Sequence, residues 1–172
     1  DQVGNVSDYG IHTVTIDTTA PTTPNVTSDA TATNTQRPTW NWSIISDAVK
    51  YTWSLESVNE GGQVLSVVLT GTTTLNLFKP NQNLSDGYYK LNVVAVDSLE
   101  NESNAGSFTI KIDATPPDSP DISSPGITRN RKPSWSYGVS DESNPTYGVT
   151  FQNESEIITT NTTYTPTEDL EN

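Results

Sequence analysis

Apolar and polar residues alternate along most of the chain with a period of two residues. The clearest example is Gly87–Val96, in which Tyr89, Leu91, Val93 and Ala95 share one face and the residues between them face the other way. A period of two is the pattern of a half-buried β-strand, and no stretch shows the periodicity of an amphipathic helix. The pattern therefore predicts an all-β protein.

Seven runs of this kind lie between residues 20 and 113. Turn signals such as Asn59–Gly62 and Asp86-Gly87 separate them. In chain order the predicted strands are Pro24–Thr27, Arg37–Ser43, Tyr51–Leu55, Val64–Leu69, Thr73–Phe78, Gly87–Val96 and Phe108–Ile112. Seven short alternating strands in about 95 residues are typical of an immunoglobulin-like (Ig-like) or fibronectin-III-like β-sandwich.

One stretch of sequence occurs twice. Residues 1–21 read DQVGNVSDYGIHTVTIDTTAP and residues 97–117 read DSLENESNAGSFTIKIDATPP, at an offset of 97 − 1 = 96 residues. In addition, KPSWSY at 132–137 repeats RPTWNW at 37–42. A period of about a hundred residues indicates a tandem array of whole domains rather than a solenoid of short repeats.

The repeat predicts three parts. Residues 1–19 match the C-terminal loop and strand of a preceding Ig-like repeat, with the strand over His12–Ile16. Residues 20–113 form a complete repeat, and residues 114–172 match the N-terminal part of a following repeat, without its last two strands. Thr18–Pro24 is a proline-punctuated linker, which we expect to act as a stiff spacer. Exchange of strands between copies is a second interpretation of the two incomplete parts.

The composition excludes several classes of function. Eight basic and 21 acidic residues give a net charge of −13, which argues against binding to nucleic acid or to anionic membranes. No apolar run reaches the roughly 18 residues of a membrane span, so we expect no membrane insertion. The chain has no Cys and a single His, His12, so the usual nucleophile–base pairs cannot be assembled and we predict no enzymatic activity.

The pattern RPTWNWS…LSDGYYKLNVVAVDSLENES…FTIKIDATPPDSP resembles the Ig-like repeats of large bacterial surface adhesins and biofilm-associated proteins. Repeats of that family end on D-x-x-G-N-x-S, a strand, and I-D-x-T-A-P. Residues 1–21 fit this pattern, whereas the second copy departs from it at Glu100 and Pro116. The resemblance implies a non-enzymatic, extracellular stalk on a bacterial cell surface, often stiffened by calcium, whose partners are neighbouring repeats of the same chain.

Oxygen-bearing side chains are predicted to meet where one repeat joins the next. The loops of a seven-stranded sandwich gather at its two poles, so Asp17, directly before the linker, should lie near the loop Asp97–Gly106. Calcium takes about six to eight oxygen ligands from such loops. The candidate ligands are Asp17, Asp97, Asn101, Glu100 (or Glu102) and Asp47, with Asp113, Asp141 and Glu142 as half a site at the next joint. Asp and Asn in turns also bond to their own backbone, which is the second interpretation of the same residues.

Two other functions fit the sequence. One is a ligand-binding module whose loops or edge strand contact a host or matrix glycan or protein. The other is a spacer in a secreted polysaccharide-degrading enzyme or a phage fibre. Trp40, Trp42, Trp53 and Trp135 alternate with polar residues on predicted strands, so we expect them to pack in cores rather than to form a sugar-binding platform.

Overall fold

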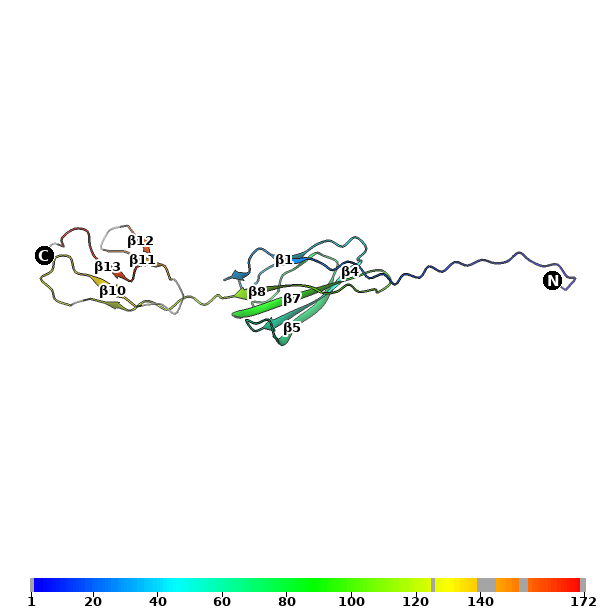
Figure 1. Cartoon of the computed structure of the whole chain (residues 1–172), viewed down its shortest axis with the longest axis horizontal. Coiled ribbons are helices and arrows are strands. Elements are labelled where there is room, and N and C mark those ends of the chain that lie inside the picture. The colour runs from blue at the N-terminus through cyan, green and yellow to red at the C-terminus, as the bar shows by residue number, and fades with distance from the viewer. Residues whose placement is uncertain (1, 125, 139–144, 152–154, 171–172) are drawn as a thin grey trace. The chain divides into compact units, whose positions relative to one another are not determined.

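The structure is a computed structural model that describes residues 2–124, 126–138, 145–151 and 155–170. The chain divides into two compact units, Asp1–Ala114 and Thr115–Asn172, which are described here one at a time. All regular elements of the described residues are strands, as Figure 1 shows, and none of these residues forms a helix able to cross a membrane. The predicted all-β fold is confirmed.

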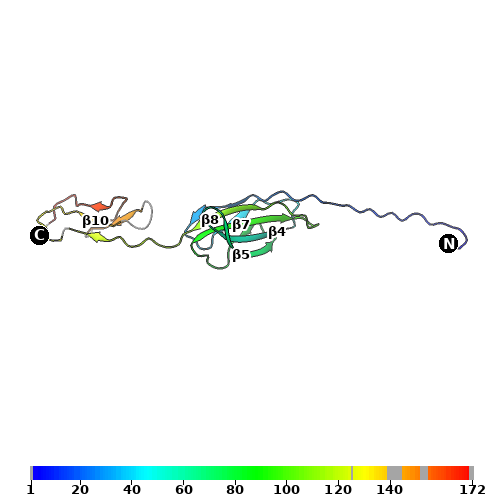
Figure 2. The ribbon, with the colours of Figure 1, turned by 60° about the horizontal axis from the view of Figure 1, so that its bottom comes forward.

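The first unit contains two sheets. A five-stranded sheet has the order β2-β8-β7-β4-β5 and a three-stranded sheet has the order β1-β3-β6 (Figures 1 and 2). The strands are β1 Val26–Ser28, β2 Ala32–Thr33, β3 Trp40–Trp42, β4 Lys50–Val58, β5 Val64–Thr73, β6 Leu77–Phe78, β7 Gly87–Val96 and β8 Gly106–Ile112. Each of the seven predicted runs contributes a strand. The sequence missed β2, a two-residue strand that runs parallel to β8.

The core of this unit lies between the two sheets. Trp40 and Trp42 are both buried on β3, with the half-buried Asn41 between them, as the alternation predicts. From the larger sheet, Leu55, Leu91 and Ile110 are fully buried and belong to the same cluster. The period-two pattern thus identified the inward faces of β3 and β7. On β6 it was wrong, because Phe78 is the buried residue and Leu77 is 44% exposed.

The strand predicted over His12–Ile16 is not formed. No strand precedes Val26 in the described part of the chain, and the side chains of Val14 and Ile16 are 72% and 84% exposed. A strand is held by ladder hydrogen bonds to a neighbour. In unit 1 the matching strand β8 is held by its pairing with β7. Residues 2–25 contain no second stretch with the alternation of β7 that could pair with His12–Ile16 in the same way.

The second unit repeats part of this arrangement. Its strands are β9 Ile122–Ser123, β10 Trp135–Tyr137, β11 Tyr147–Val149, β12 Ile157–Thr159 and β13 Thr163–Tyr164, in the sheets β13-β10-β9 and β11-β12. Trp135 is registered with Tyr164 as Trp40 is with Phe78. The backbone N–H of Gly138 donates to Asp121, as that of Ser43 donates to Asn25. The second unit is therefore built on the same plan as β1, β3, β4, β5 and β6.

The start of β8 runs directly against the linker that enters the first unit. A Cβ added to Gly106 would lie 1.8 Å from the carbonyl oxygen of Pro24, a distance that no side chain tolerates. We predict that Gly106→Ala lowers the free energy of unfolding of this unit by about 1–3 kcal/mol, because the backbone must shift. Urea unfolding followed by tryptophan fluorescence measures the loss.

The matched control is Gly10→Ala, at the same position of the repeated motif. An added Cβ there meets nothing within 4 Å. We expect a change within about 0.5 kcal/mol. Equal effects of the two substitutions would show that the close approach of β8 to the linker does not constrain the fold.

Candidate functional site

The loop between β7 and β8 is closed by the carboxylate of Asp97. Its Oδ1 accepts the backbone N–H groups of Leu99 and Asn101, each at 2.8 Å, and its Oδ2 accepts the side-chain Nδ2–H of Asn101, also at 2.8 Å. The backbone N–H of Asp97 in turn donates to the carbonyl of Asn101 at 3.1 Å. Asp97 is only 6% exposed, so this buried carboxylate is stabilised by three donors from its own loop.

Ser103 completes the loop on the side of β7. Its backbone N–H donates to the carbonyl of Ala95, and its Oγ accepts the N–H of Ala95, both at 2.9 Å. The Oγ–H then donates to the carbonyl of Asn104 at 2.8 Å. The Asp, Asn and Ser of the repeated motif therefore have a structural role that holds the end of β7 against the start of β8.

Glu100 occupies the position at which the motif carries glycine. Its φ is +65°, a conformation that side chains disfavour, and Gly4 at the same position of the first copy has a φ of +89°. The carboxylate of Glu100 bonds to the Nζ of Lys50 on β4 at 2.7 and 2.8 Å. This position of the motif therefore has a left-handed backbone in both copies. In the second copy the residue there, Glu100, also forms an ion pair with β4.

Asn101 connects this loop to the linker. Its Nδ2 donates to the backbone carbonyl of Asp17 at 3.2 Å as well as to the carboxylate of Asp97. The sequence predicted that Asp17 lies beside Asn101, and the structure brings them together although they are 84 residues apart. The Oδ1 of Asp17 accepts the N–H of Thr19 at 2.9 Å. Pro21 and Pro24, which follow in the linker, are both buried.

The other predicted ligands lie elsewhere. Asp47 is exposed in the loop between β3 and β4. Asp113 forms an ion pair with Lys111 at 3.0 Å, and Glu102 forms a β-bridge with Val96. Asp141 and Glu142 lie outside the described residues. Within the described part of the chain, no three His, Cys, Asp or Glu side chains come close enough together to hold a metal ion.

The residues at the joint therefore fit calcium incompletely. Both carboxylate oxygens of Asp97 already accept hydrogen bonds, and Glu100 is paired with Lys50. The oxygens with a lone pair left for a cation are the carbonyl of Asp17, which already accepts one hydrogen bond from Asn101, the amide oxygen of Asn101 and one oxygen of Asp97. Calcium at this joint stays a prediction.

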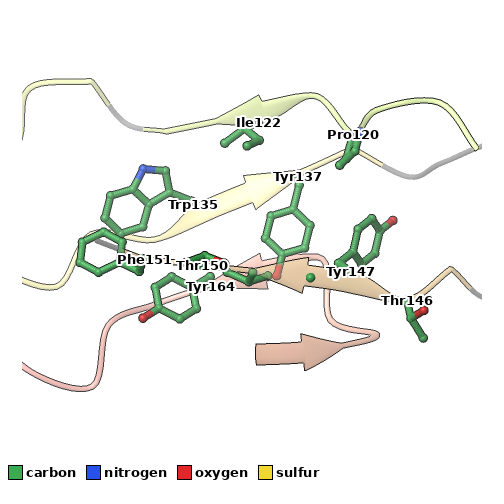
Figure 3. Close-up of a pocket in the computed structure, with 11 residues that line it drawn as sticks. Pro120, Ile122, Trp135, Tyr137, Thr146, Tyr147, Thr150, Phe151 and Tyr164 are labelled. Carbon is green, nitrogen blue, oxygen red and sulfur yellow. The ribbon is translucent and has the colours of Figure 1, made fainter. Parts of the chain in front are cut away.

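An apolar pocket of about 510 Å³ lies between the sheets of the second unit (Figure 3). The aromatic side chains that line it are Trp135, Tyr137, Tyr147, Phe151 and Tyr164. Trp135 and Tyr164 correspond in register to Trp40 and Phe78, which are buried in the first unit. The pocket is thus the counterpart of the core of the first unit. In the first unit, side chains of β7 and β8 such as Leu91 and Ile110 occupy this space.

A match to a known protein family agrees with this architecture. The sequence profile of the bacterial Ig-like domain matches residues 19–114. The chain belongs to this family. This match covers the complete sandwich and the end of the linker that enters it.

Two solved structures are similar to the chain at low sequence identity. The central fibronectin-III array of RIM-binding protein is 17% identical, with a TM-score of 0.37, over 91% of this chain and 55% of that one. A tetra-tandem repeat in the extending region of a large adhesion protein is 21% identical, with a TM-score of 0.35, over 88% of this chain and 41% of that one. The chain thus spans about half the length of the first of these proteins and less than half the length of the second. No curated protein matches it.

The loop contacts of this Ig-like sandwich make its stability dependent on pH. The bonds from Asn101 lower the pKa of Asp97, against a smaller opposing effect of burial. A carboxyl group whose pKa is lowered by folding stabilises the fold above its unfolded pKa of about 3.9, and this contribution is lost as the pH falls through the folded value. We predict that Asp97→Asn is less stable than the natural chain at pH 7 and that the difference narrows below about pH 4.

The test is the free energy of unfolding of both proteins, measured by chemical denaturation at several pH values. A range of roughly pH 2.5 to 7 covers the titration of an aspartate. The control is Asp47→Asn, which changes the same charge at an exposed position. A difference between Asp97→Asn and the natural chain that stays constant with pH would contradict the role given to the carboxylate.

Proposed function

We propose that this chain is a non-enzymatic stalk segment of a bacterial cell-surface adhesin, a rigid extracellular spacer of Ig-like repeats. The observation that carries the proposal is the linker–loop contact, in which Asn101 bonds to both Asp17 and Asp97. A spacer needs each repeat to hold the segment that enters it.

The linker is held along its length. Pro21 and Pro24 are buried, and the carbonyl of Pro24 lies against Gly106 at the start of β8. Proline fixes φ and so removes backbone freedom that a flexible tether would have. These contacts support a joint that bends little, because bending requires the prolines and Asn101 to leave the sandwich.

The repeated plan supports an array. The second unit reproduces the pairings of β3 and β6 in β10 and β13, and its linker again contains prolines, in ATPPDSP at 114–120. The function of a stalk is mechanical. Folded sandwich domains resist extension, and short linkers limit the range of angles between neighbouring domains. The proposed partners are neighbouring repeats of the same chain.

Calcium stiffening of the joint is the finer part of the proposal. Its support is the meeting of Asp17, Asp97 and Asn101 at one place. When bound, the ion would draw together oxygens that otherwise repel one another. The competing explanation is that the hydrogen bonds of Asn101 already hold the joint without a metal.

Two other functions remain distinct proposals. A ligand-binding module for a host or matrix glycan or protein is supported by the exposed apolar side chains of β5. A spacer in a secreted polysaccharide-degrading enzyme or a phage fibre has the same fold requirements as a stalk. Further Ig-like repeats in the sequence beside this chain would favour the adhesin, and a catalytic domain there would favour the enzyme.

The rigid joint is tested by distances between spin labels. The chain has no Cys, so labels at Thr15→Cys and Ser85→Cys report specifically on the linker and the sandwich. We expect a narrow distance distribution that broadens in Asn101→Ala, because both bonds of the side-chain amide are lost. Asn104→Ala is the matched control, an exposed asparagine of the same loop. A distribution as broad in the parent as in Asn101→Ala would refute the rigid joint.

Calcium is tested on the same labelled protein. If the ion binds at the joint, adding calcium after a chelator narrows the distance distribution and raises the melting temperature, and Asp97→Asn weakens both effects. Magnesium serves as the control ion, because it prefers a smaller octahedral site. Unchanged melting and unchanged distances would exclude the calcium part and leave the hydrogen-bonded joint in place.

A further inference from the structure

The strand β5 is an open edge of the five-stranded sheet. It ends the order β2-β8-β7-β4-β5, and on its outer side no strand of the described residues pairs with it (Figure 1). β5 is ten residues long, from Val64 to Thr73. The outer edge of such a strand presents backbone N–H and C=O groups that another strand can bind.

Charge, proline and short length, three of the features that protect a sheet edge, are absent from β5. It contains no charged residue and no proline, and its sequence is VLSVVLTGTT. The other edges of this unit are different: β1 has three residues, and β2 and β6 have two, with Lys79 and Pro80 directly after β6. Short length, lysine and proline are the features that prevent strands from pairing between molecules.

Five of the ten residues of β5 have apolar, exposed side chains. The exposed fractions are 51% for Val64, 67% for Leu65, 59% for Val67, 38% for Val68 and 37% for Leu69. Two bulges interrupt the pairing with β4, so that Leu65 and Val68 have no partner residue on that strand. Bulges redirect side chains at sheet edges, and here both extra residues are apolar.

Charge favours a second copy of this chain as the occupant of the edge. The net charge of −13 opposes contact between most surfaces of two copies. The stretch from Gly61 to Phe78 contains no charged residue, so two copies can approach along it without opposed carboxylates. A second copy also supplies an uncharged apolar strand of the same length.

We propose that β5 is a self-association edge, at which two copies of this chain pair antiparallel through their β5 strands. A two-fold axis perpendicular to the sheet reverses the direction of the strand and brings the outward N–H groups of one copy opposite C=O groups of the other. With Val67 on the axis, Leu65 of each copy lies across from Leu69 of the other. This gives a continuous sheet of ten strands from two five-stranded sheets.

The pairing is expected to be weak. Standard interfaces bury about 800 Å² per partner, and one strand with five exposed apolar side chains falls below this. Association would therefore depend on high local concentration. The inference concerns the edge of one sandwich and does not depend on the proposed stalk function.

Sedimentation velocity over roughly a hundredfold range of concentration, up to about 0.5 mM, tests the proposal, since weak complexes dissociate below this range. We expect a reversible monomer–dimer equilibrium. Val67→Lys should weaken it at least tenfold, because a buried lysine opposes strand pairing. The control Ile44→Lys adds the same charge at a position that is 78% exposed in the loop between β3 and β4. It should leave the equilibrium unchanged.

A cross-linking experiment tests the register independently of the folding of Val67→Lys. Because Val67 lies on the proposed axis, Val67→Cys should form a disulfide-linked dimer on mild oxidation, whereas Ile44→Cys should stay monomeric. A monomer at all concentrations, or a dimer that Val67→Lys leaves intact, would overturn the proposal. Asn101→Ala should dimerise like the natural chain, which separates this result from the test of the rigid joint.

Discussion

The first unit depends on Trp40, which connects its two sheets. The side chain is fully buried on β3, packs against Phe78 at a ring-centroid distance of 5.9 Å, and donates its Nε1–H to the carbonyl of Phe108 on β8 at 3.2 Å. A sandwich is otherwise held by non-directional apolar contacts, which fix the distance between sheets better than their relative position. The indole bond adds direction, because a buried N–H without an acceptor is costly.

The same constraint explains why the entry of the linker is so closely defined. Since β8 is tied to Trp40, its first residue Gly106 has a fixed position, and the carbonyl of Pro24 lies against it. The loop before β8 is likewise fixed at both ends, through Asp97 and Ser103. A linker that contacts both Gly106 and Asn101 is therefore positioned by the core rather than by its own sequence alone.

Much of the fold of the first unit could be predicted from the sequence, because strands that bury alternate residues have apolar residues at every second position. The alternation identified β3, β4, β7 and β8 and their inward faces. The gathering of loops at the poles of a sandwich predicted the meeting of Asp17 with Asn101. The parallel pair of β2 with β8 was not predictable, since two residues carry no periodicity. At His12–Ile16 the sequence predicted a strand that is not formed. An alternating sequence forms a strand only beside a neighbouring strand, and no neighbouring strand is present for it among the described residues.

The candidate site shows why acidic loops are ambiguous in sequence. The residues that suit a calcium ion, Asp97 and Asn101, are also those that satisfy the N–H groups of a tight loop. A carboxylate has about four lone-pair directions, and Asp97 uses three of them on its own loop. A cation at this joint would have to share Asp97 with these donors rather than replace them, because the loop that presents the carboxylate is held by the same bonds. Any calcium affinity here must therefore come mainly from oxygens that keep a lone pair available, namely the amide oxygen of Asn101 and the carbonyl of Asp17, which accepts one hydrogen bond from Asn101.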